Sequence, residues 1–247
     1  MPQNSLLIIP LLGKLFIFVA LQMSILVMSL QHLKHLIRSK FSSRTHEEQL
    51  DLKYVYCIKH VSPAERLLLS QSGMHFLNQN HTNKIVTQLE NLTESADAFV
   101  IKKDIVVPPL AIYTADCLPI LGWNMNHIFL AHLGWKGLYR GLIYHIKAQL
   151  QSKIDYAFLG ASICQKNYTV QNDFVHTWRN QPFFNMCYDN KLFTFSLKRM
   201  ATAQLEISSQ NIISKKVCTF EDNSYASYRR NKTANRNLLI YSSTALL

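Results

Sequence analysis

A cysteine and a histidine lie fifteen residues apart in this chain, and each stands beside residues that turn the backbone. Cys117 follows an apolar run and precedes Pro119, while His132 comes directly before the loop Gly134–Gly137. Three of the seven glycines in the chain fall within eight residues here, the third being Gly141. Because glycine is used where the backbone bends sharply or approaches another group closely, this spacing indicates a functional site.

The residue types allow three kinds of chemistry at this point of the chain. Cys117 and His132 could share a metal ion with His81, and two imidazoles with one thiolate suit a zinc site that keeps a fourth position open for water or substrate. Alternatively, Cys117 is a nucleophile with a histidine as its base. In the third interpretation Cys117 is a small buried apolar residue and His132 a hydrogen-bonded core histidine. The spacing leaves all three open.

Two expected strands position these side chains. Alternation in the run 128–133 places Ile128, Leu130 and His132 on one face, with His132 near the strand end. Cys117 follows the apolar run 110–113, and Pro119 is expected to end the regular hydrogen bonding there. Both residues should therefore lie at strand ends.

The remaining pattern predicts one domain of α/β type that begins near residue 50. Helical spacing of apolar residues predicts helices at Ala64–Ser72, Leu138–Leu150 and Leu197–Ile207. Alternating or β-branched runs predict extended segments at Leu52–Ile58, Lys84–Gln88, Ala98–Ile101, Leu110–Tyr113, Ile128–Leu133, Tyr156–Leu159, Val217–Phe220 and Leu238–Tyr241.

Composition narrows the class of protein. The chain has 247 residues, of which 48% are hydrophobic and 17% charged, as in ordinary globular domains. Its net charge is +11, but the basic residues are scattered and their longest runs are pairs, so we expect no nucleic-acid partner. The five cysteines are odd in number and show no CxxC spacing, which predicts free thiols in a reducing, cytoplasmic compartment.

The first 49 residues are expected to form an extension before a catalytic domain at 50–247. Leu15–Leu30 is an apolar run of sixteen residues, shorter than the roughly twenty that span a bilayer, and no small-residue cleavage site follows it. We expect translation to begin at Met28 and the preceding residues to be dispensable. The alternative is a membrane anchor formed by residues 15–30.

Four motifs occur in the order seen in the YfiH-like proteins. These are QNHTNKIV at 79–86 with ADAFV at 96–100, ADCLPI at 115–120, HLGWKGLYRGLI at 132–143, and CTFEDNSYASYRR at 218–230. The chain resembles this family over roughly residues 50–243, and the pairing of ADCLP with HxGW is highly specific. The family was once described as multicopper polyphenol oxidases or laccases and is now described as purine nucleoside phosphorylases.

The resemblance implies an α+β fold, a single domain with packed mixed β-sheets flanked by helices, similar to the catalytic domain of cytotoxic necrotizing factor. It also implies that His81, Cys117 and His132 bind Zn²⁺. Phosphate would attack the ribose of adenosine or inosine, with guanosine and methylthioadenosine as further substrates and adenosine deamination as a second activity. Several coppers would need many more clustered histidines than these motifs supply.

The matching motifs also contain basic and acidic residues to which the resemblance gives roles. The basic residues are candidates for binding substrate and phosphate, namely Lys136, Arg140, Arg229 and Arg230. Asp97 and Asp116 are candidates for orienting the ligand histidines, or alternatively for capping turns.

The sequence departs from the family pattern at two points. Lys136 replaces the arginine of HAGWRG, which keeps the charge but loses bidentate phosphate geometry. The usual GPxIGPCCYEV stretch reads GASICQKNYTV at 160–170, without its prolines and adjacent cysteines. Two other functions therefore stay open: a zinc-free cysteine hydrolase or amidase acting on cell-wall peptide precursors, with Cys117 as nucleophile and His132 as base, and a non-catalytic, membrane-tethered interaction protein.

Overall fold

A computed structural model describes residues 55–92 and 94–244. The extension expected at residues 1–49, including the apolar run 15–30, lies outside the described residues, as does the start of the strand expected at 52–58. Within the described part, none of the helices combines the length and apolar character needed to cross a bilayer.

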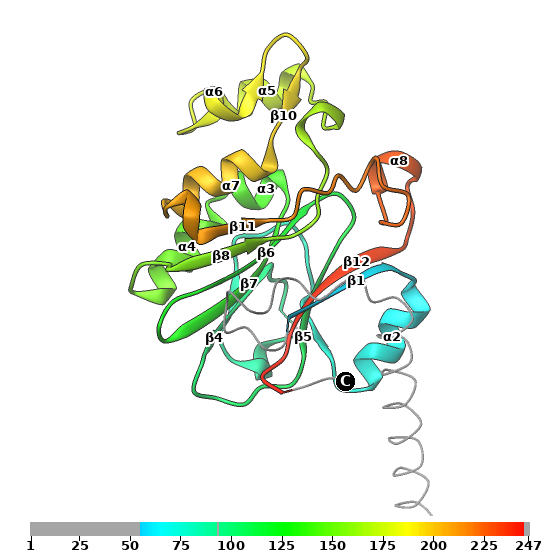
Figure 1. Ribbon diagram of the computed structural model, residues 1–247, viewed down its shortest axis with the longest axis vertical. Helices are drawn as coiled ribbons and strands as arrows, with labels where there is room; N and C mark the ends of the chain where they lie inside the picture. Colours follow the sequence, from blue (N-terminus) through cyan, green and yellow to red (C-terminus); the bar gives the residue numbers. More distant parts are fainter. Residues whose placement is uncertain (1–54, 93, 245–247) are drawn as a thin grey trace, which may run out of the picture.

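Two mixed sheets form the centre of the molecule (Figure 1). The first has the strand order β1-β12-β5-β2, with bounds Val55–Val61, Arg236–Tyr241, Leu110–Thr114 and His75–Phe76. The second has the order β11-β8-β6-β7-β4-β3, with bounds Ile212–Ser214, Tyr156–Leu159, Leu118–Trp123, His127–Leu133, Ala98–Lys102 and Ile85–Val86. A short third sheet pairs β9 (Tyr188–Asp189) with β10 (Thr194–Phe195).

Helices flank both sheets. Those on the side of the six-stranded sheet are α3 (Trp135–Tyr139), α4 (Leu142–Leu150), α5 (Asn172–Trp178), α6 (Phe184–Cys187) and α7 (Leu197–Leu205). On the other side, α2 (Pro63–Gln71) covers the four-stranded sheet and begins at a capping box formed by Ser62 and Glu65. A short helix α8 (Tyr228–Asn231) precedes β12.

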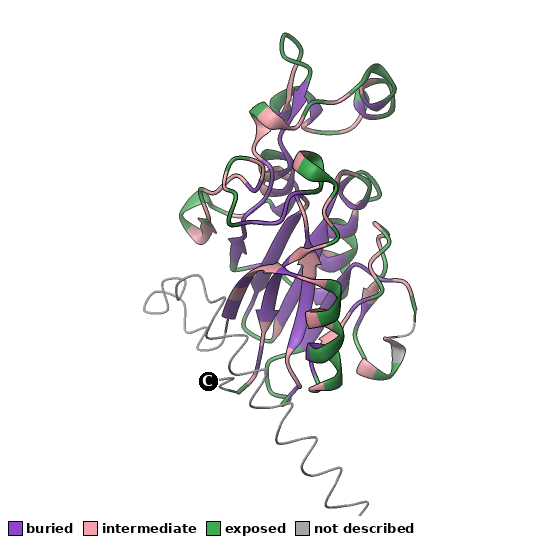
Figure 2. Cartoon of the chain, turned by 90° about the vertical axis from the view of Figure 1, so that its right-hand side faces the viewer, coloured by how far each residue is buried: buried purple, intermediate pink, exposed green. Residues whose placement is uncertain are grey.

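Three apolar cores hold these layers together. One lies between the two sheets, where Ile112 and Leu239 face Phe99 and Leu130. A second lies between the six-stranded sheet and helices α3 to α7, and it continues into an aromatic group around Trp178. The third packs α2 on the outer face of the four-stranded sheet. Figure 2 shows the result: the strands are buried, whereas the outer side of α2 is exposed.

This architecture confirms the predicted fold class, a single α+β domain with packed mixed sheets flanked by helices. It also confirms the alternation in β7, because Ile128 and Leu130 face the core between the sheets while Phe129 and Ala131 face the helices. As a consequence, His132 points to the side where the two sheets meet.

Several predicted elements need correction. The helix expected over 138–150 is two helices, because Gly141 takes a left-handed backbone with φ of 74° between α3 and α4. The strand expected over 84–88 shortens to β3. The extended segment expected at Val217–Phe220 is wrong, since Cys218 makes an isolated bridge to Ser162 and a turn follows.

Pro119 does not end regular pairing as expected, because it lies inside β6 and pairs with His132 of β7. On the other side of β6, pairing with β8 begins at Ile120. The carbonyl of Pro119 accepts a hydrogen bond from Gly160, just beyond β8, at 2.9 Å. Proline has no backbone N–H, and the nitrogen of Pro119 faces β8 at a point just beyond the paired residues of β6 and β8. No hydrogen bond of that pairing is therefore lost, and proline is tolerated near the start of β6.

Candidate metal centre

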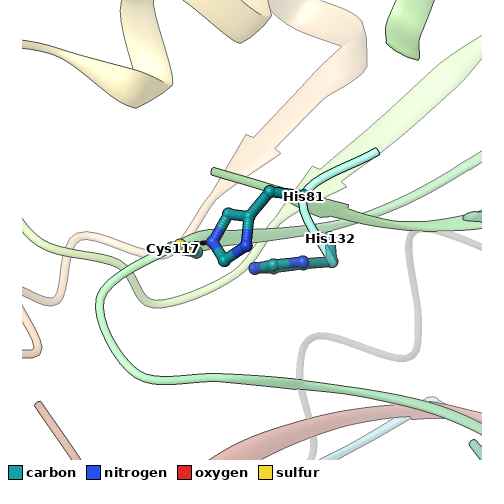
Figure 3. A group of neighbouring side chains, drawn as sticks. All are labelled: His81, Cys117 and His132. Carbon is teal, nitrogen blue, oxygen red and sulfur yellow. Dashed lines mark hydrogen bonds between the residues drawn. The ribbon is translucent and has the colours of Figure 1, made fainter. Parts of the chain in front are cut away.

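Three separate segments bring His81, Cys117 and His132 together at one end of the six-stranded sheet. His81 lies in the loop between β2 and β3, Cys117 directly before β6, and His132 near the end of β7. Their possible ligand atoms all lie within 4.8 Å of one another, and His81 Nε2 is 3.7 Å from Cys117 Sγ. The two imidazole rings meet edge to face, with centroids 4.8 Å apart (Figure 3). We call these three residues the ligand cluster.

Asp97 ties two members of the ligand cluster to the sheet. Its buried carboxylate is 2.7 Å from Nδ1 of His132, which leaves Nε2 of that ring available to the cluster. The same carboxylate accepts hydrogen bonds from the backbone N–H of His81 at 3.1 Å and from the hydroxyl of Thr82 at 2.8 Å. Asp97 therefore orients His132 and also holds the loop that carries His81.

Gly134 provides the space in which His81 lies. A Cβ atom at this position would stand 2.5 Å from Cδ2 of His81 and 3.1 Å from Sγ of Cys117. The first separation is far shorter than van der Waals contact and the second is tight, so any larger residue would displace His81. The loop after β7 thus needs glycine here for close approach, while its φ of −80° is open to any residue.

A strained turn presents Cys117. The preceding residue, Asp116, has a φ of 88°, which is rare for a residue with a side chain. Its carboxylate accepts hydrogen bonds from the Thr219 hydroxyl at 2.7 Å and from the Arg229 backbone N–H at 2.6 Å. Its carbonyl accepts one from the backbone N–H of Ile163 at 3.0 Å. These contacts offset the strain and show that Asp116 holds the turn, whereas Asp97 orients the histidine.

The ligand cluster is electrostatically coupled. Burial raises the pKa of the Cys117 thiol, but His132 and then His81 outweigh this effect and lower the pKa to about 6. Burial lowers the pKa of His132, whereas the Cys117 thiolate and Asp97 raise it to about 9. In the absence of metal, neutral pH thus favours a thiolate beside an imidazolium.

The four basic residues singled out from the sequence occupy different environments. Arg229 is exposed, donates to the carbonyl of Thr169 at 3.0 Å and lies 5.1 Å above the ring of Tyr168. Arg230 donates instead to backbone carbonyls of the preceding turn, including that of Thr219 at 2.7 Å. Its guanidinium is occupied in holding this turn.

The other two basic residues belong to α3 and its C-terminal end. Arg140 donates to the carbonyl of His81 at 2.8 Å and so fixes the loop of that ligand. Lys136 is exposed, with its ammonium 5.6 Å from the ring centre of Trp135.

Two residues near the site had no role in the sequence analysis. Thr82 donates to Asp97 from both its backbone and its hydroxyl, and Tyr168 packs under Arg229. Burial and the neighbouring Cys117 thiolate raise the pKa of Tyr168, so its hydroxyl stays protonated. Thr82 follows His81 directly in the sequence, but nothing in the pattern of residues points to its partner fifteen positions away.

The ligand cluster fits a tetrahedral zinc ion. Bond lengths of about 2.3 Å to sulfur and about 2.0 Å to nitrogen would separate the two donors by about 3.5 Å, close to the 3.7 Å between Cys117 and His81. One ring nitrogen of His132 is already engaged by a carboxylate, as is usual for histidines that bind metals. Three donors would leave a fourth position for water or substrate.

Comparison with known proteins identifies the family. A sequence profile of the family described as multi-copper polyphenol oxidoreductase laccase matches residues 59–240, and the chain therefore belongs to this family. The match includes all three members of the ligand cluster. The resemblance inferred from the motifs is thereby confirmed.

Relatives and solved structures agree with this assignment. A purine nucleoside phosphorylase of Campylobacter jejuni is 30% identical over 170 residues, which cover 65% of this chain and 73% of that protein. A purine nucleoside phosphorylase of Aquifex aeolicus is 28% identical, with 65% and 78% covered. Among solved structures, YlmD from Geobacillus stearothermophilus has a TM-score of 0.65 at 19% identity, covering 82% of this chain and 98% of its own.

A second solved structure, YfiH of Bacillus licheniformis, has a TM-score of 0.60 at 22% identity, covering 69% of this chain and 74% of its own. At such identities the two structures establish the fold alone.

Proposed function

We propose that this protein is a zinc-dependent purine nucleoside phosphorylase, which cleaves adenosine or inosine with inorganic phosphate to the free base and ribose 1-phosphate. The observation that carries the proposal is the convergence of His81, Cys117 and His132 within 4.8 Å, in a chain whose relatives are named purine nucleoside phosphorylases. Guanosine, methylthioadenosine and deamination of adenosine belong to the same proposal as further substrates and a second activity. The proposed setting is the cytoplasm.

Zinc suits this proposal better than a set of coppers. In the described part of the chain, two groups of three metal-ligand side chains occur, and the ligand cluster is the one that contains histidine. Zinc held there would supply Lewis-acid polarisation of a bound substrate oxygen or nitrogen. Asp97 would keep His132 in the orientation that presents Nε2, and Gly134 would keep room for His81.

Arg229 is the residue that we assign to phosphate. Its backbone is held by the carboxylate of Asp116, next to Cys117, while its exposed guanidinium has a carbonyl and a hydroxyl of Thr169 as hydrogen-bond partners. An arriving phosphate can replace these two weak acceptors with charged oxygens, which bind a guanidinium more strongly. Arg230 lacks this freedom because backbone carbonyls hold its guanidinium. It would serve the site through the turn that it holds.

The direct test is a product assay. Purified protein is incubated with adenosine or inosine, with and without phosphate, and free base, ribose 1-phosphate and inosine are separated by chromatography. We expect base and ribose 1-phosphate to form only with phosphate. Arg229→Ala should weaken phosphate use by about 1.5–3 kcal/mol, seen as a raised KM for phosphate with zinc retained. A zinc-loaded protein that releases neither base nor ammonia from any purine nucleoside would refute the function.

A second candidate function draws on the same side chains without metal. Cys117, His132 and Asp97 have the order of a nucleophile, the base that takes its proton and a carboxylate that orients the base. This arrangement favours a cysteine hydrolase or amidase, for which cell-wall peptide precursors are a candidate substrate. Activity that persists after complete zinc removal would favour the hydrolase.

A further inference from the structure

A second group of reactive side chains lies outside the ligand cluster. Cys164 follows the end of β8, and Cys218 lies on the segment after β11, with their Sγ atoms 2.6 Å apart. The backbone N–H of Cys164 also donates to Sγ of Cys218 at 3.1 Å, and the bridge between Ser162 and Cys218 holds the two segments side by side. We call Cys164 and Cys218 the thiol pair.

The spacing of the thiol pair suits a disulfide better than a metal. A tetrahedral zinc ion would hold two thiolates about 3.7 Å apart, whereas a disulfide brings them to about 2.05 Å. The nearest carboxylate, that of Glu221, is already engaged by Lys166 at 2.6 Å and by the amide of Asn167 at 2.8 Å. Both contacts are made by Oε1 of Glu221, so the thiol–thiol distance is the observation that favours a disulfide.

The two thiols are not equivalent. Burial and the hydrogen bond to Cys218 raise the pKa of Cys164 to about 11. Burial also raises the pKa of Cys218, but hydrogen bonds from Cys164 and Asn167 outweigh it and lower the pKa overall. The pair therefore places the more acidic thiol at Cys218 beside Cys164, which stays protonated at neutral pH. In thiol–disulfide exchange the more acidic thiol is the one that reacts first as a thiolate.

The thiol pair opens on a cavity of about 500 Å³ that is rich in lysine. Lys198 and Lys216 line it together with both cysteines, and the charge of Lys166 is balanced by Glu221. Lys198 is half-buried and donates to the carbonyl of Lys215. The remaining positive charge favours an anionic occupant.

We propose that Cys164 and Cys218 form a redox-active dithiol, oxidised by a small anionic disulfide that binds in this lysine-lined cavity. The Cys218 thiolate attacks one sulfur of the disulfide, so that a mixed disulfide forms and the first small thiolate leaves. Cys164 then loses its proton and attacks the Cys218 sulfur, which forms the protein disulfide and expels the second small thiolate. The protein dithiol loses two electrons and two protons, and the small disulfide is reduced to two thiols.

Oxidation would cross-link two segments that hold the turn of Cys117. Ile163, just before Cys164, donates its N–H to the carbonyl of Asp116, and Thr219, just after Cys218, donates its hydroxyl to the carboxylate of Asp116. The thiol pair is therefore adjacent to the ligand cluster in the fold. The redox chemistry itself does not depend on the proposed phosphorylase activity.

The test treats the zinc-loaded full chain with glutathione disulfide, blocks remaining thiols with iodoacetamide, and maps the peptides by mass spectrometry. We expect a Cys164–Cys218 disulfide, while the buried Cys187 stays a thiol that is alkylated only after unfolding. In Cys164→Ser the reaction should stop at a mixed disulfide on Cys218. Recovery of both cysteines as alkylated thiols after treatment with excess disulfide would overturn the proposal.

Charge selectivity tests the assigned occupant. At equal concentration, anionic glutathione disulfide should oxidise the thiol pair about tenfold faster than the dication cystamine, and Lys216→Gln should reduce this difference. Hydroxyethyl disulfide, which is neutral, serves as the matched control and should react equally with both proteins. Equal rates for all three disulfides would overturn the assignment of an anionic occupant.

Discussion

The ligand cluster and the thiol pair both place soft ligand atoms within bonding reach, yet their surroundings differ. His132 and Cys117 lie at the ends of central strands, with the buried carboxylate of Asp97 behind one and a backbone turn held by Asp116 behind the other. The thiol pair lies on connecting segments beside an exposed Glu221 and three lysines. Donor atoms alone thus do not define a metal site.

The difference lies in what supports the donors. In the ligand cluster, side chains fixed by the sheet and an oriented imidazole favour a metal ion, which needs a set geometry. In the thiol pair, two sulfurs in close contact with different pKa values favour thiol–disulfide exchange. Matched variants of the ligand cluster and of the thiol pair can separate metal binding from disulfide formation.

The largest expected effect is the contrast between removing a cysteine of the ligand cluster and removing one of the thiol pair. Cys117→Ala should weaken zinc binding by more than about 100-fold and abolish phosphorolysis, because two ligands hold the metal poorly. Cys218→Ala should keep both zinc and activity. Zinc content after gel filtration, together with titration against a chelator, measures the contrast. Equal zinc loss in the two variants would contradict the assignment of zinc to the ligand cluster and not to the thiol pair.

A second comparison concerns the two aspartates that support the ligand cluster. Asp97→Asn should weaken zinc binding by about 10–100-fold, because the neutral amide no longer holds Nδ1 of His132 by a charge-assisted hydrogen bond. Asp116→Asn should keep the zinc affinity, since Asp116 meets Thr219 and Arg229 and asparagine tolerates a positive φ. Chelator competition on both variants checks the prediction, and a larger loss for Asp116→Asn would contradict it.

Two glycines three residues apart provide a third comparison, Gly134 at the N-cap of α3 and Gly137 within that helix. Gly134→Ala should destabilise the protein by about 1–3 kcal/mol and displace His81, because the new methyl group would meet the imidazole at 2.5 Å. Gly137→Ala meets its nearest atom at 3.4 Å, an ordinary contact, and should fold and bind zinc normally. Urea unfolding and zinc content measure both effects. Normal zinc binding by Gly134→Ala would contradict the need for glycine beside His81.

The smallest effect concerns the pH at which Cys117 reacts in the metal-free protein. Its pKa is lowered to about 6, so the thiolate predominates above that pH and is lost as the pH falls through it. Alkylation by iodoacetamide, followed by peptide mapping, should have a midpoint near pH 6 at Cys117, whereas Cys164, with its pKa raised to about 11, stays slow through neutral pH. Zinc should protect Cys117. A midpoint near the pKa of free cysteine would contradict the lowering of the Cys117 pKa by His132.

The sequence predicted most strands of the two large sheets but missed β6, which begins directly after Cys117. The predicted strands 110–113 and 128–133 correspond to β5 and β7, because their apolar runs are buried in the sheets. The strand β6 was missed because proline, which lacks a backbone N–H, normally interrupts a strand. Pro119 is tolerated because the pairing of β6 with β8 begins only at the next residue, Ile120.

Long-range contacts explain the other gaps. The helix α5 and the strand β10 are held by ring contacts among Phe174, Trp178 and Phe195, and no periodicity in the sequence predicts these contacts. The residues of the ligand cluster came from the motifs, but the reason for Gly134 is a contact with His81, 53 positions earlier. The expectations for residues 1–49 stay predictions, since those residues lie outside the described part.

The most direct test of the metal centre is the zinc content of the full chain, purified without added metal and measured by atomic emission beside copper and iron. We expect about one zinc per chain, bound through His81, Cys117 and His132, and no stoichiometric copper. Zinc should fall to background in His132→Ala and stay near one per chain in Cys164→Ser. Folded wild-type protein that holds no zinc, or a His132→Ala variant that keeps its zinc, would contradict a zinc site at the ligand cluster.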